Sequence, residues 1–141
     1  MLSDENDFFK RELQIDSEAT FLELNDFILD SLGYARDELT TFHICDEEWQ
    51  KELEITMMDM GASSDEDSYL MADTRLEDLL DHKGQHLFFV FDMLSERGFF
   101  IELAELIPGK SLDKPVVTKA EGKAPKQLES IEVAASRLAT P

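Results

Sequence analysis

Cysteine, glycine and long hydrophobic runs are scarce in this 141-residue sequence, and each scarcity excludes a class of protein. The single cysteine excludes an internal disulfide and a cysteine-rich zinc site, so we expect a reducing compartment, the cytoplasm. The six glycines stand singly and form no glycine-rich phosphate loop, so we expect no cofactor. No apolar run approaches the roughly 18 residues of a membrane span, and the acidic first residues do not resemble a signal peptide.

Basic residues are also few, since the sequence has 13 Lys and Arg against 32 Asp and Glu, for a net charge of -19. This charge repels phosphate groups and anionic lipids, which excludes an ordinary nucleic-acid or membrane-surface protein. Hydrophobic residues make up 43% of the chain, which is enough to build a core. We therefore expect a folded, soluble protein whose surface favours basic partners.

Charge and composition change near Pro108. Residues 1–107 hold 28 acidic and 7 basic side chains, whereas residues 108–141 hold 4 and 6 and are interrupted by prolines and glycines. We predict an acidic α+β domain over residues 1–107 and an extended, partly disordered basic tail over residues 108–141. The part up to about residue 127 either lies over the domain or acts as a linker, and residues 128–138 have the spacing of a weak C-terminal helix.

Hydrophobic periodicity predicts five strands and two helices. Apolar residues alternate or run continuously over residues 9–15, 39–45, 53–57, 87–91 and 99–103, and the charged outer row of 53–57 predicts an edge strand. A Thr20–Glu23 capping pattern begins a helix that ends at Gly33, and a Thr74–Glu77 pattern begins a short helix closed by residues 82–84. This order predicts an α+β fold with an antiparallel or mixed sheet of about five strands, two helices on one face, and a β-grasp-like arrangement.

The acidic loop over residues 61–68 is the first candidate site. Asp65, Glu66 and Asp67 are clustered carboxylates, which hard cations such as Ca²⁺ prefer. The EF-hand pattern does not fit, because leucines stand at the positions of its glycine and its bidentate glutamate. We predict a solvated acidic loop, with weak cation binding as the alternative.

The second candidate site is the acidic step Asp46, Glu47 and Glu48 together with Trp49, the only tryptophan. An exposed tryptophan beside carboxylates suits the recognition of a basic partner, so these four residues are the candidate interaction surface. The alternative is a tryptophan that covers the edge of the core. The sequence leaves both interpretations open.

Histidine and cysteine spacings predict neither a metal site nor a nucleophile. His82 and His86 are four residues apart, but Gly84 ends the helix that would align them. Cys45 shares a strand face with His43, yet the carboxylates that follow disfavour a thiolate, so Cys45 is interpreted as a packing residue. No pair of carboxylates stands out as acid and base, so we assign no catalytic residue and expect no enzyme.

The order and spacing of several segments resemble a known family, the plasmid pRiA4b Orf-three-like proteins, which are also described as insertion-element passenger proteins. The resemblance rests on residues 9–13, 20–24, 32–34, 39–42, 76–80, 84–85, 87–92 and 99–103. It implies one α+β domain over about residues 8–108, in a bacterial cytoplasm. The Trp and His that the family usually carries at the hairpin after Asp92 are missing here. The resemblance implies no biochemical function.

The leading hypothesis is a non-enzymatic protein-interaction module whose acidic surface binds a basic protein partner. One alternative is a nucleic-acid mimic, whose carboxylates would occupy the phosphate-binding surface of a DNA-binding protein. Another is an enzyme with a cleft near residues 61–68. An acidic surface that serves only solubility is an equally simple interpretation. The sequence predicts no direct contact with nucleic acid or membrane, and it leaves the oligomeric state open.

Overall fold

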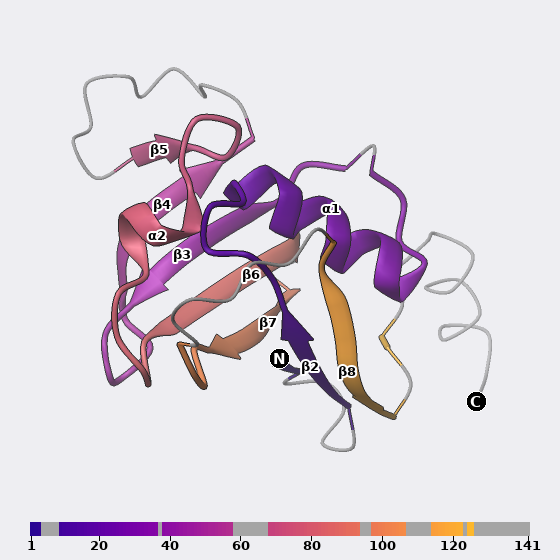
Figure 1. Ribbon diagram of the computed structural model, residues 1–141. Coiled ribbons are helices and arrows are strands. Elements are labelled where there is room, and N and C mark those ends of the chain that lie inside the picture. The colour runs from indigo at the N-terminus through magenta and orange to yellow at the C-terminus, as the bar shows by residue number, and fades with distance from the viewer. Residues whose placement is uncertain are drawn as a thin grey trace.

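The computed structural model describes residues 1–3, 9–36, 38–57, 68–93, 97–106, 114–122 and 124–125. Over these residues the chain forms one eight-stranded mixed sheet and two short helices (Figure 1). The predicted fold, with about five strands, two helices on one face and a β-grasp-like arrangement, is therefore wrong, because the protein is mostly sheet. In chain order the elements are β1 (Leu2–Ser3), β2 (Lys10–Gln14), α1 (Phe21–Leu32), β3 (Thr41–Cys45), β4 (Lys51–Thr56), β5 (Ser68–Leu70), α2 (Leu76–Leu79), β6 (His86–Asp92), β7 (Arg97–Glu102) and β8 (Val116–Glu121).

The strands lie in the order β5-β4-β3-β6-β7-β1-β2-β8, and every neighbouring pair is antiparallel except β4 and β5. The predicted set omits β1, β5 and β8. β1 and β5 have only two and three residues, and all six residues of β8 are exposed, so no apolar row marks these strands. Pairing with neighbouring strands forms them instead. Because β5 pairs outside β4, residues 53–57 are not at the edge of the sheet as predicted.

Strand β8 lies beyond the predicted domain boundary and pairs antiparallel with β2. Arg11 strengthens this pairing, since its guanidinium donates to the carbonyl oxygens of Glu121 at 2.7 Å and Gly122 at 3.0 Å. Residues 116–121 therefore belong to the sheet. The helix predicted over residues 128–138 lies outside the described residues and stays a prediction.

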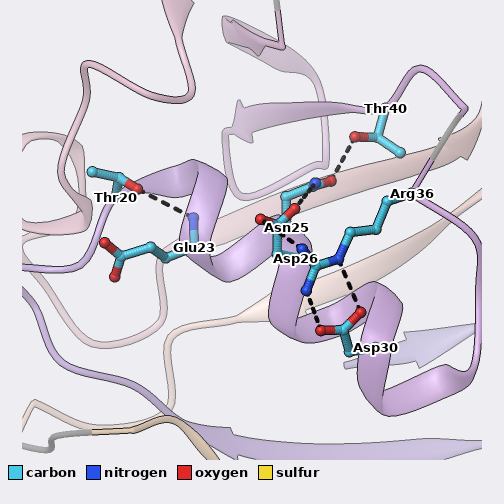
Figure 2. Close-up of polar contacts among 7 residues, drawn as sticks. All are labelled: Thr20, Glu23, Asn25, Asp26, Asp30, Arg36 and Thr40. Atoms are coloured by element: carbon cyan, nitrogen blue, oxygen red, sulfur yellow. Dashed lines mark hydrogen bonds and ion pairs between the residues drawn. The ribbon is translucent and has the colours of Figure 1, made fainter.

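Helix α1 is determined largely by local sequence. The Thr20 hydroxyl accepts a hydrogen bond from the Glu23 backbone N–H at 3.1 Å (Figure 2), and the helix ends at Gly33, whose φ of 72° is left-handed. Within the helix, the Asn25 side-chain oxygen accepts from the Thr40 hydroxyl at 2.6 Å, which fixes the helix to the start of β3 (Figure 2). Its buried residues are Phe21, Leu24, Asn25, Ile28 and Leu29.

Helix α2 is shorter than predicted, at four residues. It begins after Arg75, whose backbone N–H donates to the Asp78 carboxylate at 2.9 Å. The capping interaction therefore stands one residue later than the Thr74–Glu77 pattern. Leu76 is buried and joins the main core, so packing as well as capping holds this single turn.

The main core lies between α1 and one face of the sheet (Figure 1). Phe42, Phe89 and Phe99 stand opposite one another on β3, β6 and β7 and are fully buried. The ring centroids of Phe42 and Phe89 are 4.6 Å apart, and Phe21 of α1 contacts Phe42 at 5.5 Å. Alternate residues of these strands point to the other side, so the prediction that His43 faces away from Phe42 is confirmed.

Candidate functional site

The open face is the side of the sheet that carries His43, Phe88 and Phe100 on β3, β6 and β7. These residues are Cα partners across neighbouring strands, so their side chains form one row. The row continues to Glu54 on β4 and to Leu2 on β1. The three ring-bearing side chains are half-buried and Leu2 is 49% exposed, so this face presents apolar surface to solvent.

The turn between β3 and β4 folds a tryptophan over the open face. Asp46 holds this turn, because its carboxylate accepts from the backbone N–H groups of Glu48 at 2.8 Å and Gln50 at 2.9 Å, and its carbonyl accepts from the Trp49 N–H at 3.1 Å. Trp49 has a φ of 66°, a left-handed conformation that costs a residue with a Cβ about 1–2 kcal/mol. Such a conformation persists only where the surrounding contacts hold it.

Those contacts come from aromatic residues of β6 and β7. The Trp49 indole lies parallel to the His86 imidazole, with centroids 3.9 Å apart and planes 2° apart. Phe100 meets the indole at 71° and 4.9 Å, and Phe88 contacts Phe100 at 5.1 Å. The Nδ1 atom of His86 lies 3.0 Å from the Asp46 carbonyl oxygen, which ties the imidazole to the turn. Trp49, His86, Phe88 and Phe100 are all half-buried, and we call them the aromatic cluster.

Gly98 on β7 allows Phe88 to lie close to the sheet. A Cβ at Gly98 would stand 2.5 Å from the Phe89 carbonyl oxygen and 2.7 Å from the Phe88 Cζ atom. The Phe88 ring therefore lies over the backbone at a position that only glycine leaves open. An aromatic ring over a glycine of the neighbouring strand stabilises a sheet, so the aromatic cluster is anchored by packing.

Carboxylates border the aromatic cluster. Glu102 is the Cα partner of His86, and Glu54 is the partner of His43, so both belong to the open face. Glu102 is exposed and forms no salt bridge with another described residue. Lys51 places its Nζ atom 5.8 Å from the centroid of the Phe88 ring. Lys51 thus places a cation of the protein beside an aromatic ring of the open face, and the Met1 ammonium interacts with the charge of Glu102. Aromatic rings and carboxylates are groups that attract cations.

Burial favours the uncharged forms of His43 and Cys45, which lie next to the cluster. Burial, together with the charge of Lys51, lowers the pKa of His43 to about 4, and the ring lies 3.2 Å from the Thr41 hydroxyl. Burial also raises the pKa of the Cys45 thiol, which donates to the His43 carbonyl at 3.6 Å. Cys45 is therefore a buried packing residue, as its sequence context indicates, and is not an activated thiolate.

The residues of the predicted interaction surface have different roles in the structure. Asp46 holds the turn, Glu47 and Glu48 are exposed, and Trp49 packs on the open face rather than at the edge of the main core. Their use as an interaction surface stays a prediction. The candidate cation loop, residues 65–67, lies outside the described residues.

The two histidines spaced four apart do not meet at a metal site. His82 lies beside Asp81, with its Nδ1 atom 2.6 Å from the carboxylate, whereas His86 stacks on Trp49. In the part of the chain that the structure describes, no group of three or more His, Cys, Asp or Glu side chains could hold a metal ion.

The residues of β6 and β7 that complete the site are missing from the sequence-based candidates. The continuous apolar run over residues 87–91 predicts a strand but conceals which side chains face each side. The available signal is the spacing of two between His86 and Phe88, and again between Phe100 and Glu102. That spacing marks a shared face only when the pairing of the two strands is known.

A hollow of about 450 Å³ lies at the C-terminal end of α1. Its Arg11 guanidinium donates to three backbone carbonyl groups and lies 4.4 Å from the centroid of Phe9. We interpret the hollow as a structural feature that lies where α1 packs against the β2–β8 pair, and not as a binding site. It is lined by Arg11, Ser31, Leu32, Gly33, Tyr34, Ala124 and Pro125.

A protein-family match spans all of the strands and helices described above. The family model described as plasmid pRiA4b ORF-3-like protein matches residues 1–130. The chain belongs to the plasmid pRiA4b ORF-3-like family. This confirms the resemblance of the shorter segments, and the match extends past β8.

The fold of this pRiA4b ORF-3-like chain is similar to that of a solved structure. It is the crystal structure of a protein of unknown function from Methanosarcina mazei Go1, with a TM-score of 0.63 and 18% sequence identity. The match covers 79% of this chain and 61% of that chain, so the present chain spans about three fifths of that protein's length. Comparison with curated proteins gave no match. Over the described residues, no helix has the length and apolar character to cross a membrane.

Proposed function

We propose that this pRiA4b ORF-3-like protein is a non-enzymatic interaction module that binds a basic protein segment on the open face. The observation that carries the proposal is the half-buried aromatic cluster with the exposed carboxylate of Glu102 on the same face. Aromatic side chains supply contact area, and carboxylates supply charge that favours a cationic partner.

The net charge favours this occupant over others. A charge of -19 steers a basic partner toward the protein and opposes binding of a second copy of the chain. The same charge repels a nucleic-acid backbone. A basic protein segment is the occupant that suits both the aromatic surface and the charge.

The polar groups beside the cluster support binding rather than catalysis. His43, with its pKa lowered to about 4, is a poor general base at neutral pH, and the raised pKa of the Cys45 thiol opposes thiolate formation. We also propose a cytoplasmic location, which the single buried free cysteine supports.

Trp49 is the only tryptophan, so its fluorescence reports directly on the open face. We expect octa-arginine and octa-lysine peptides to change this fluorescence saturably at physiological ionic strength, and more strongly at low salt, where charge attraction is less screened. Calorimetry on the same samples measures the affinity independently of the indole.

An octa-glutamate peptide is the control, and it should change neither signal. The proposal fails if both basic peptides bind no better than octa-glutamate.

A further inference from the structure

The inference rests on the proposed function and names the group that the open face recognises. We infer that the bound segment is anchored by an arginine, whose guanidinium stacks on the Trp49 indole and pairs with the Glu102 carboxylate. The open face is then an arginine-selective surface rather than a general acidic one.

The shape of the stacking surface favours a planar guanidinium. The indole of Trp49 already stacks on a flat, nitrogen-containing ring, since the imidazole of His86 lies parallel to it within 2° at 3.9 Å. Trp49 is only half-buried, so part of this residue is accessible to a ligand. A guanidinium is planar and weakly hydrated and stacks on such surface, whereas the compact ammonium of lysine has no plane to stack.

The Glu102 carboxylate lies where it can pair with the stacked group. Glu102 stands opposite His86, the residue beneath the indole, and is exposed. Asp92, by contrast, is buried and pairs with Arg97. Glu102 forms no salt bridge with another described residue, so its two oxygens can accept the paired N–H groups of a guanidinium.

The protein's own arginines show both contacts separately. Arg36 presents two nitrogens to the carboxylate of Asp30, with Nε at 3.0 Å from one oxygen (Figure 2). Arg97 lies over the Phe91 ring, with the guanidinium carbon 5.0 Å from the centroid. The proposed anchor combines these two contacts on one external arginine.

The Trp49 side chain is preorganised for binding. The hydrogen bonds that the Asp46 carboxylate accepts from the Glu48 and Gln50 backbone N–H groups, together with the stack on His86, hold Trp49 in place before any ligand arrives. A ring that is already fixed loses little conformational entropy when a guanidinium stacks on it. A small number of contacts is then sufficient for selectivity.

The test compares octa-arginine with octa-lysine by Trp49 fluorescence and calorimetry. We expect octa-arginine to bind about tenfold more tightly. The Glu102→Gln variant should lower the octa-arginine affinity about fivefold and reduce the arginine preference, and Glu102→Asp should restore part of it.

Glu18→Gln is the matched control, because Glu18 is exposed and precedes α1 on the chain, away from the aromatic cluster. It removes the same charge and should leave the arginine preference unchanged. A Trp49→Phe variant, measured by calorimetry, should weaken octa-arginine more than octa-lysine, and circular dichroism checks that each variant is folded.

Equal affinities for the two peptides would overturn the inference and leave the proposed function standing. The inference is also wrong if Glu102→Gln and Glu18→Gln change the arginine preference equally. Absence of binding by both peptides would overturn the proposed function and the inference together.

Discussion

Trp49 shows how far a single residue can depart from what its neighbours in the sequence suggest. The end of a short hairpin turn that needs a positive φ favours glycine or asparagine, yet a tryptophan occupies this position. The stack on His86 and the contact with Phe100 offset the cost of the left-handed backbone. Because successive turn residues point in different directions, Trp49 lies on the sheet while Glu47 remains exposed.

His43 is a second single residue with a measurable effect, because its titration makes the free energy of unfolding depend on pH. Its pKa is lowered from 6.5 to about 4 by burial and by Lys51. Between pH 6.5 and about pH 4 the His43 side chain binds a proton in the unfolded chain but not in the folded protein. The contribution of His43 to the free energy of unfolding is therefore fully present above pH 6.5 and is lost as the pH falls to about 4. We expect denaturant unfolding to show a larger loss of stability over this window in the wild type than in His43→Gln.

The difference in pH dependence between the wild type and His43→Gln separates the effect of His43 from that of the many carboxylates that also titrate in acid. Matching pH profiles for the two proteins would contradict this assignment.

At the scale of elements, the strands that carry an apolar pattern are predicted correctly and the strands without one are missed. The patterns over residues 87–91 and 99–103 are found as β6 and β7, which pair with each other as an antiparallel hairpin. Helix α1 has its predicted cap and stop because those signals are local. Strands β1, β5 and β8 lack such signals, because β1 and β5 have only two and three residues and β8 is exposed along its whole length.

The β6–β7 hairpin depends on the missing side chain at Gly98. An added Cβ would meet the Phe89 carbonyl oxygen at 2.5 Å and the Phe88 ring at 2.7 Å, so the backbone and the ring must both shift. We expect Gly98→Ala to destabilise the protein by about 1–3 kcal/mol in urea unfolding. Glu102→Ala, at an exposed position of the same strand, is the control and should change stability by about 0.5 kcal/mol or less. A Gly98→Ala variant as stable as the wild type would show that Phe88 does not pack as described.

At the scale of the whole molecule, the net charge of -19 opposes folding through mutual repulsion. Ion pairs such as that of Arg36 with Asp30 relieve only part of it, because basic residues are few. We expect the melting temperature to rise when NaCl is increased from low concentration to about 0.3 M, since added ions screen the repulsion.

Calorimetric melting at several salt concentrations measures this effect, and KCl should give the same curve as NaCl. A melting temperature that falls with salt would mean that favourable ion pairs outweigh the repulsion.

The sequence by itself determined the acidic character, the lack of an internal disulfide, helix α1, the five strands that carry apolar patterns, and the family. These properties follow from composition and from periodicities within single segments, which need no knowledge of distant residues. The tertiary structure alone decided the eight-strand order and the aromatic cluster. The reason is that the register between β6, β7 and the β3–β4 hairpin brings Trp49, His86 and Phe100 together, and register between strands is a property of their pairing.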